Sequence, residues 1–193
     1  MAGAVFFWYA LGTMSALSRP IAITDIETSG LDARIHEILE LAVIVVDPHT
    51  LEPLKTYSTK IRPTRIERGA KKALEVCGYT PASWRYAANL RTAMENYAEA
   101  CEGAIFAGHN VFFTWSFIAE AFQQSGIEDP MDYHRLDLFS VAWAHQNTLN
   151  RPRAAMRLED IAKALDIDPE PKPHRAMQGA KLQLAILQKL MRP

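Results

Sequence analysis

Cysteine is scarce in this chain: Cys77 and Cys101 are the two cysteines among 193 residues. They form no disulfide framework, and their spacing is not that of a metal site. We expect both thiols to be reduced and partly buried, as in a cytosolic protein, and therefore predict a cytoplasmic location.

An excess of charge of one sign is also missing, because the formal net charge at pH 7 is −1. No global basic field attracts nucleic acid, so any contact with nucleic acid has to come from a local patch. The hydrophobic fraction of 49% and the charged fraction of 22% are ordinary for a soluble globular protein. The length suits one domain with a sizeable core.

A hydrophobic run long enough to cross a bilayer is not found either. Residues 1–17 carry no charge and include an apolar stretch at 5–11, which is too short for a membrane span. A signal peptide is disfavoured because the basic n-region is absent. Two alternatives stay open for this segment: an extension that packs on a single domain at 18–193, or a start-site artefact with the true start at Met14.

Short apolar and β-branched runs predict strands, and apolar residues spaced three and four apart predict helices. Three strands come first and the later strands alternate with helices, which favours a layered α/β fold. Strands are expected at 21–24, 38–47, 55–61, 104–108 and 136–138, and helices at 68–76, 90–102, 114–125, 139–144, 158–165 and 177–191, with a proline-rich loop at 166–173.

Asp25 and Glu27 come at the end of the first predicted strand. Residues two apart on a strand point to the same face, where two carboxylates repel each other unless a cation holds them. Hard divalent cations such as Mg²⁺ prefer oxygen ligands of this kind. Taken alone, the pair could equally be two solvated acids at a strand end.

Two later segments favour the metal site over two solvated acids. The first is Gly108-His109-Asn110-Val111-Phe112-Phe113 and the second is Pro173-His174-Arg175-Ala176. Together with Asp25-Ile26-Glu27-Thr28-Ser29-Gly30, their order and spacing resemble the DEDDh 3′–5′ exonucleases, the group that includes the proofreading epsilon subunit of bacterial DNA polymerase III. The resemblance covers about residues 20–190, and it implies a ribonuclease H-like fold with a mixed five-stranded sheet flanked by helices.

The resemblance also implies a chemistry, in which two divalent ions, Mg²⁺ or Mn²⁺, lie over the scissile phosphate of a single-stranded 3′ end of DNA or RNA. It makes Asp25 the ligand that bridges the ions, Glu27 a ligand of one ion, and His174 the general base for the attacking water. The contacts to the terminal nucleotide then fall on Thr28, Gly30, Leu31, His109 and Asn110.

Two acidic positions of the family pattern are replaced, by Thr114 and by Gly179. Threonine is a good N-cap, so we interpret Thr114 as a residue that opens its helix without the charge. Glycine inside the last helix costs about 1 kcal/mol relative to alanine, so stability does not explain Gly179. We therefore expect catalysis to be impaired or lost, with at most one weakly held ion at Asp25 and Glu27.

Another acid could replace the missing ones. The candidates are five acidic residues that follow the second motif or precede His174. We favour Asp137, because a strand end can face the cleft. The full set is Glu120, Asp137, Asp166, Asp168 and Glu170.

A group of basic residues between 55 and 72 is either a solvated face or a ridge that contacts phosphates. It comprises Lys55, Lys60, Arg62, Arg65, Arg68, Lys71 and Lys72, and Arg151, Arg153 and Arg157 could form a second rim. Besides a weakened exonuclease, two non-enzymatic functions remain open: a module that binds nucleic-acid 3′ ends without cutting, and a protein-interaction scaffold. A polymerase partner and self-association are left undecided.

Overall fold

The computed structural model describes residues 18–145 and 157–191. The predictions for the apolar segment 1–17, and for Arg151 and Arg153, lie outside these residues. Within the described part of the chain, no helix is long and apolar enough to span a membrane.

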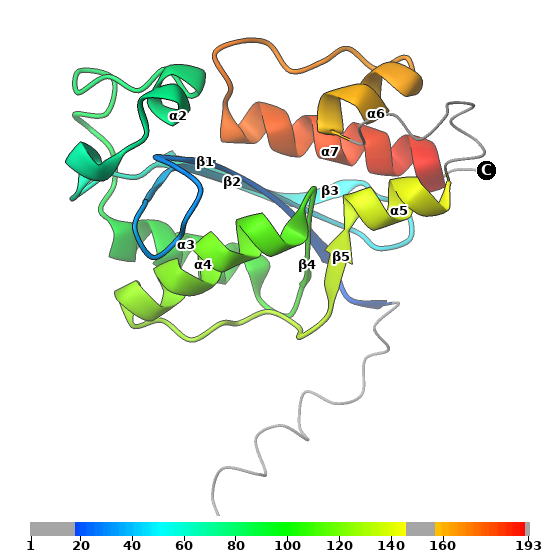
Figure 1. Cartoon of the computed structure of the whole chain (residues 1–193). Helices are drawn as coiled ribbons and strands as arrows, with labels where there is room; N and C mark the ends of the chain where they lie inside the picture. Colours follow the sequence, from blue (N-terminus) through cyan, green and yellow to red (C-terminus); the bar gives the residue numbers. More distant parts are fainter. Residues whose placement is uncertain (1–17, 146–156, 192–193) are drawn as a thin grey trace, which may run out of the picture.

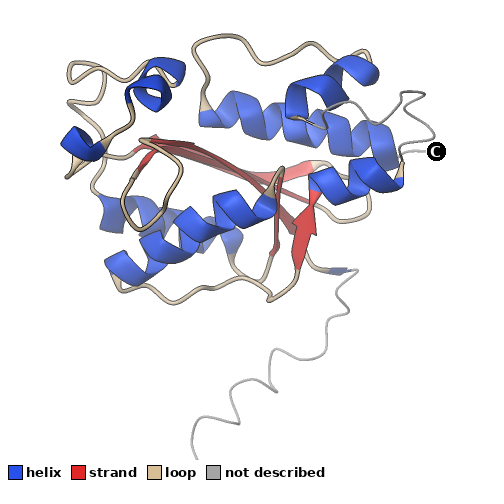
Figure 2. Ribbon diagram, in the orientation of Figure 1, coloured by secondary structure: helices blue, strands red, loops and turns tan. Residues whose placement is uncertain are grey.

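The structure is a five-stranded mixed sheet between two layers of helices (Figures 1 and 2). The strand order is β3-β2-β1-β4-β5, in which β1, β2 and β3 are antiparallel while β4 and β5 run parallel to β1. This confirms the predicted fold class. The strands are β1 (Ile21–Thr28), β2 (Ile38–Val46), β3 (Pro53–Lys60), β4 (Ile105–Gly108) and β5 (Arg135–Asp137).

The helices cover both faces of the sheet. In Figure 1, α3 and α4 lie on one side, and α5, α6 and α7 lie on the other. The helices are α2 (Lys71–Val76), α3 (Leu90–Cys101), α4 (Val111–Ser125), α5 (Leu138–Ala144), α6 (Leu158–Ala164) and α7 (Ala176–Met191), with a short 3₁₀ turn η2 (Ile66–Arg68).

Strand β2 is buried along its whole length, because helices pack on both of its faces. Its sequence is correspondingly apolar, with Glu40 as the one charged residue. Glu40 lies directly across from Glu27 in the antiparallel pair of β1 and β2. A buried charge is costly unless a group of opposite charge compensates it. We therefore expect such a group in the surroundings of Glu27 and Glu40.

Helix α4 begins earlier than predicted. It starts at Val111, and its N-cap is Asn110, which has a left-handed backbone with φ of 57°. Thr114 is therefore inside the helix and buried, so the interpretation of Thr114 as an N-cap is wrong. The physical reason is that Asn tolerates the left-handed conformation, which lets the chain turn directly from β4 into the helix.

Candidate active site

Strand β1 places Asp25 and Glu27 on the face of the sheet that α7 covers. Ile23, two residues before Asp25, belongs to the core between the sheet and helices α5 to α7. Alternation along the strand puts Asp25 and Glu27 on that same side, as the sequence predicted. On the neighbouring strand, Ala42 and Glu40 pair with them.

Gly179 lies against Asp25. A Cβ atom built on Gly179 would come within 2.7 Å of the Asp25 Cγ, and it would overlap the carboxylate. The Asp25 side chain thus occupies the space into which a side chain at position 179 would extend. Glycine at this position is explained by that close approach.

Gln183 holds Asp25 in this position. The Gln183 Nε2 atom donates a hydrogen bond of 2.8 Å to Asp25 Oδ1, and its Oε1 atom accepts one of 3.0 Å from the backbone N–H of His109. Gln183 is 2% exposed, and it joins the first motif to the second. The sequence analysis did not identify Gln183. Its position on the same apolar helix face as Ala180 and Leu187 could have indicated a buried polar residue with a specific partner.

We expect Gln183→Met to destabilise the protein by roughly 1–3 kcal/mol, because Asp25 and the His109 N–H lose a buried partner. Urea unfolding would measure the change. Gln178→Met on the exposed side of the same helix is the matched control, with little expected effect. Equal stability of Gln183→Met and the natural protein would contradict this role for Gln183.

The carboxylates around β1 strongly perturb one another. Burial raises the pKa of Asp25 well above its ordinary value, and the charges of Glu27 and Glu170 raise it further. Burial, together with Glu170 and Glu40, raises the pKa of Glu27 to about 8. Burial also raises the pKa of Glu40. These raised pKa values mean that the neighbouring cations do not offset the negative charge of the carboxylates when all of them are ionised.

The loop before α7 brings two further groups to this place. One ligand atom from each of Glu27, Glu170 and His174 lies within 4.8 Å of the other two, and the Glu170 side chain is 7% exposed. His174 Nδ1 is 3.4 Å from Glu170 Oε2. Glu170 Oε1 accepts a hydrogen bond of 2.7 Å from the Arg175 backbone N–H, which fixes the end of the loop.

Arg175 is the cation that acts on Glu27, and it acts together with Lys60 on Glu40. Its Nη1 atom is 3.7 Å from Glu40 Oε2 and donates a 2.6 Å hydrogen bond to the Cys77 carbonyl. The backbone N–H of His174 donates to the Val76 carbonyl. The third motif is therefore tied to the end of α2.

Asp137 does not serve as the substitute acid that we favoured. It caps α5, where its Oδ2 atom accepts hydrogen bonds from the Ser140 N–H and hydroxyl, and its Oδ1 atom accepts one from the Val111 N–H. Glu120 also points elsewhere, since it accepts a hydrogen bond from Gln124. Of the five candidates, Glu170 is the one found beside Glu27 and His174.

The residues predicted to contact the substrate come from the end of β1, from the turn that follows it and from the residues after β4. They are called the rim below. The Thr28 hydroxyl donates to the Gly30 carbonyl at 2.6 Å, and Gly30 is closely covered by the His36 ring. Leu31 is 83% exposed. His109 is half-buried and its Nδ1 atom has no hydrogen-bond partner in the structure.

Phe112 is a further rim residue, which the sequence analysis did not single out. It lies in the first turn of α4 and is 84% exposed, whereas its neighbour Phe113 packs against the core. The signal was present in the sequence, because two adjacent aromatic residues on a helix cannot both face the core.

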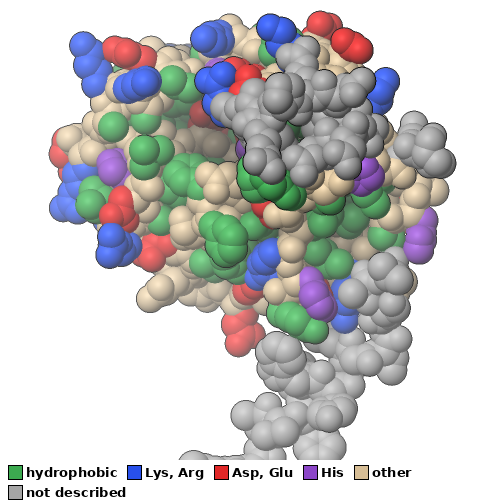
Figure 3. Space-filling view, turned by 45° about the vertical axis from the view of Figure 1, so that its right-hand side comes forward, with side chains coloured by type: hydrophobic (Ala, Val, Ile, Leu, Met, Phe, Trp, Pro, Cys, Tyr) green, Lys and Arg blue, Asp and Glu red, His purple; other side chains and the backbone are tan. Residues whose placement is uncertain are grey.

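The basic residues between 55 and 72 do not form one free surface. Lys60 lies over the Trp84 ring, Arg62 donates to the Ala87 carbonyl, and Arg65 pairs with Glu37. On the face drawn in Figure 3, basic side chains are interspersed with acidic and apolar ones. Lys71, whose side chain is 92% exposed, is a better candidate for a phosphate contact.

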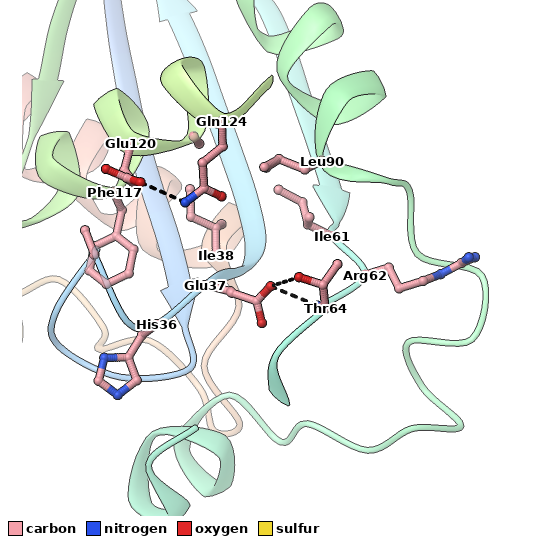
Figure 4. Close-up of a pocket in the computed structure, with 12 residues that line it drawn as sticks. His36, Glu37, Ile38, Ile61, Arg62, Thr64, Leu90, Phe117, Glu120 and Gln124 are labelled. Carbon is pink, nitrogen blue, oxygen red and sulfur yellow. Dashed lines mark hydrogen bonds between the residues drawn. The ribbon is translucent and has the colours of Figure 1, made fainter. Parts of the chain in front are cut away.

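A separate pocket lies between the segment that follows β3, helix α4 and the segment that joins β1 to β2 (Figure 4). Its acids already have partners: Glu37 accepts hydrogen bonds from Thr64 and Arg65, and Glu120 is bonded to Gln124. Phe117 forms part of its wall. The pocket shares none of its lining residues with the acidic group at Glu27.

The Exonuclease family model matches residues 22–187, which include all three motifs. The chain belongs to the DEDDh-type 3′–5′ exonuclease family. Among curated relatives, NEN3 of Arabidopsis thaliana is 25% identical over 86% of this chain, and ribonuclease T of Buchnera aphidicola is 28% identical over 64% of it. The chain spans 33% of NEN3 and 62% of ribonuclease T, which is less than two thirds of either relative.

Solved structures of Escherichia coli exonuclease I have the same fold. Exonuclease I in complex with a dT13 oligonucleotide superposes with a TM-score of 0.77 at 20% identity, covering 88% of this chain and 40% of that one. A complex with a dA16 oligonucleotide gives a TM-score of 0.75 at 19% identity, covering 89% of this chain and 40% of the other.

The two-ion arrangement of the family does not fit the residues of this chain. Thr114 and Gly179 supply no carboxylate, and the Asp25 carboxylate turns toward Gly179 and Gln183. A dication pair needs about four carboxylates for neutrality, and two of the four are missing.

Proposed function

We propose that this chain binds single-stranded 3′ ends of DNA or RNA and hydrolyses them far more slowly than a family member with four acidic positions. Membership of the exonuclease family, together with the exposed Leu31 and Phe112 beside the first two motifs, supports binding. The replacement of two acids by Thr114 and Gly179 supports the loss of rate.

The observation that carries this proposal is the contact between Gly179 and Asp25. An aspartate at position 179 has no space while Asp25 keeps its hydrogen bond to Gln183. Loss of one strong electrostatic contributor commonly costs roughly 10²–10³ in rate, and here two are gone. We propose that the metal is a single, weakly held Mg²⁺ or Mn²⁺ ion.

The rim supplies the groups that a 3′ end needs. Leu31 and Phe112 offer exposed apolar surface on which a base can stack or wedge, and Lys71 offers a charge for phosphate. Asn110 is exposed and directly precedes α4, where its side chain can contact the terminal sugar.

A 5′-labelled single-stranded oligonucleotide tests the proposal. We expect salt-sensitive binding in EDTA, and shortening in Mg²⁺ or Mn²⁺ that barely exceeds that of Asp25→Ala. Phe112→Ala should weaken binding by about 5- to 100-fold, the loss of one stacked base. Fluorescence anisotropy and gel electrophoresis would measure the two effects.

Tyr133→Ala is the matched control, because Tyr133 is 68% exposed and lies at the opposite end of the parallel strands, next to the segment that enters β5. Its binding should stay within a factor of two. No binding by the natural protein would contradict the proposal and would favour the protein-interaction scaffold. Rapid shortening that Asp25→Ala abolishes would show that the lost acids have been replaced.

A further inference from the structure

Three potential ligands converge where β1 meets the loop before α7. One ligand atom from each of Glu27, Glu170 and His174 lies within 4.8 Å of the other two. Two ligand atoms of one ion are at most about 4.2 Å apart when each bond to the ion is near 2.1 Å. Small side-chain rotations would therefore bring the three ligand atoms to bonding distance of one ion. Glu170 belongs to none of the three motifs.

Glu40 is a second observation that points to a cation. Its side chain is 9% exposed, and its Oε2 atom has no hydrogen-bond partner in the structure. It pairs with Glu27 across the two strands, and its charge acts on both Glu27 and Glu170. Four carboxylates, those of Asp25, Glu27, Glu40 and Glu170, interact here with two cationic side chains, Arg175 and Lys60, which leaves room for a divalent charge.

Helix α7 holds the Asp25 carboxylate. The Asp25 Oδ1 atom accepts a hydrogen bond from Gln183, and its Oδ2 atom fills the space beside Gly179. The residue that bridges two ions in the family pattern is thus held on the α7 side. Glu170 comes to Glu27 from the loop before α7, where it accepts a hydrogen bond from the Arg175 N–H.

We infer that Glu27, Glu170 and His174 bind one divalent transition-metal ion, with His174 as a ligand instead of a general base. An imidazole and two carboxylates favour Mn²⁺ or a similar ion over Mg²⁺, which prefers oxygen ligands alone. This inference deepens the proposed function and rests on it for its location, since the ion lies in the same cleft as the expected 3′ end.

Titration of the full chain with Mn²⁺ alone, followed by electron paramagnetic resonance, tests the inference. We expect one Mn²⁺ per chain, with affinity lowered at least tenfold in Glu170→Gln and in His174→Ala. Asp25→Asn should lower the affinity less than either of these variants does. The control Asp168→Asn removes an exposed acid from the same loop and should have no effect.

Electron spin-echo measurements on the natural protein report nitrogen bound to Mn²⁺ without any variant. Nitrogen modulation is expected, and its absence in a bound Mn²⁺ would overturn the role of His174. Loss of binding in Asp25→Asn with normal binding in Glu170→Gln would place the ion at the family position, which also overturns the inference.

Oligonucleotide binding in EDTA, measured in parallel, separates the two proposals. A protein that binds the oligonucleotide but no Mn²⁺ would contradict the metal site alone. A protein that binds Mn²⁺ in the predicted manner but no oligonucleotide would contradict the proposed function alone.

Discussion

Replacing both Thr114 and Gly179 with aspartate is expected to raise the rate of 3′-end hydrolysis by about 10²-fold or more. This is the reverse of the loss that one or two missing electrostatic contributors cause. The double variant would carry all four acidic positions of the family. The rate of shortening of a 5′-labelled oligonucleotide in Mg²⁺ and Mn²⁺ would measure the gain.

The double substitution forces Asp25 to move. A Cβ atom at position 179 overlaps the present position of the Asp25 carboxylate, so the side chain has to leave Gln183 and rotate toward Glu27. That rotation would bring Asp25 closer to Glu27 as a metal ligand, and it costs a buried hydrogen bond of about 1–3 kcal/mol. We therefore expect the variant to be less stable than the natural protein, even where it is more active.

Thr114→Asn together with Gly179→Asn is the matched control. Asparagine has nearly the size of aspartate and no charge, so it reproduces the displacement of Asp25 without the new ligands. Its rate should remain at the level of the natural protein. A folded aspartate variant that is no faster than the asparagine variant would refute the claim that missing charge limits catalysis.

The sequence predicted the fold well, because periodicity and motif order are local signals. Strands β1, β2 and β4 and helices α3 and α7 lie within a few residues of the predicted ranges. The start of α4 was misplaced by three residues, since the left-handed turn at Asn110 is a backbone feature that polarity patterns do not encode. The β1 strand also runs on through Thr28, which carries both acids inside the strand.

The site was harder to predict, because its new members come from contacts between distant segments. Gln183 is 158 residues from Asp25 in the sequence, and no sequence pattern predicts the hydrogen bond between them. Glu170 was one of five candidates, and the sequence favoured Asp137, whose carboxylate is used to cap α5. Choosing between them required the path of the loop, which the contacts of Arg175 with Glu40 and Cys77 determine.

Removing the Glu27 charge is expected to stabilise the metal-free protein at alkaline pH, by up to about 5 kcal/mol, since each unit of pKa shift corresponds to about 1.4 kcal/mol. The folded-state pKa of Glu27 is about 8, against an ordinary value of 4.5. Between these values the folded protein keeps a proton that the unfolded chain has lost. The stability of the natural protein therefore falls as the pH rises through this window.

Glu27→Gln does not titrate at this position, so its advantage should be near zero below about pH 4 and should reach its full size above about pH 8. The other titratable groups around Glu27 are the same in both proteins: Asp25, Glu40, Glu170, His174 and Arg175. Loss of the Glu27 charge also lowers the pKa of Asp25, because the Glu27 charge raises it in the natural protein. Urea unfolding in EDTA across this pH range would measure the difference.

Glu75→Gln is the control for this series, because Glu75 is 65% exposed on α2 and faces Lys71. Surface substitutions of this kind usually stay within about 0.5 kcal/mol. An advantage of Glu27→Gln that does not change with pH would mean that packing, not charge, limits stability here. An advantage that grows with pH would identify uncompensated negative charge beside β1, the condition under which a bound cation stabilises the fold most.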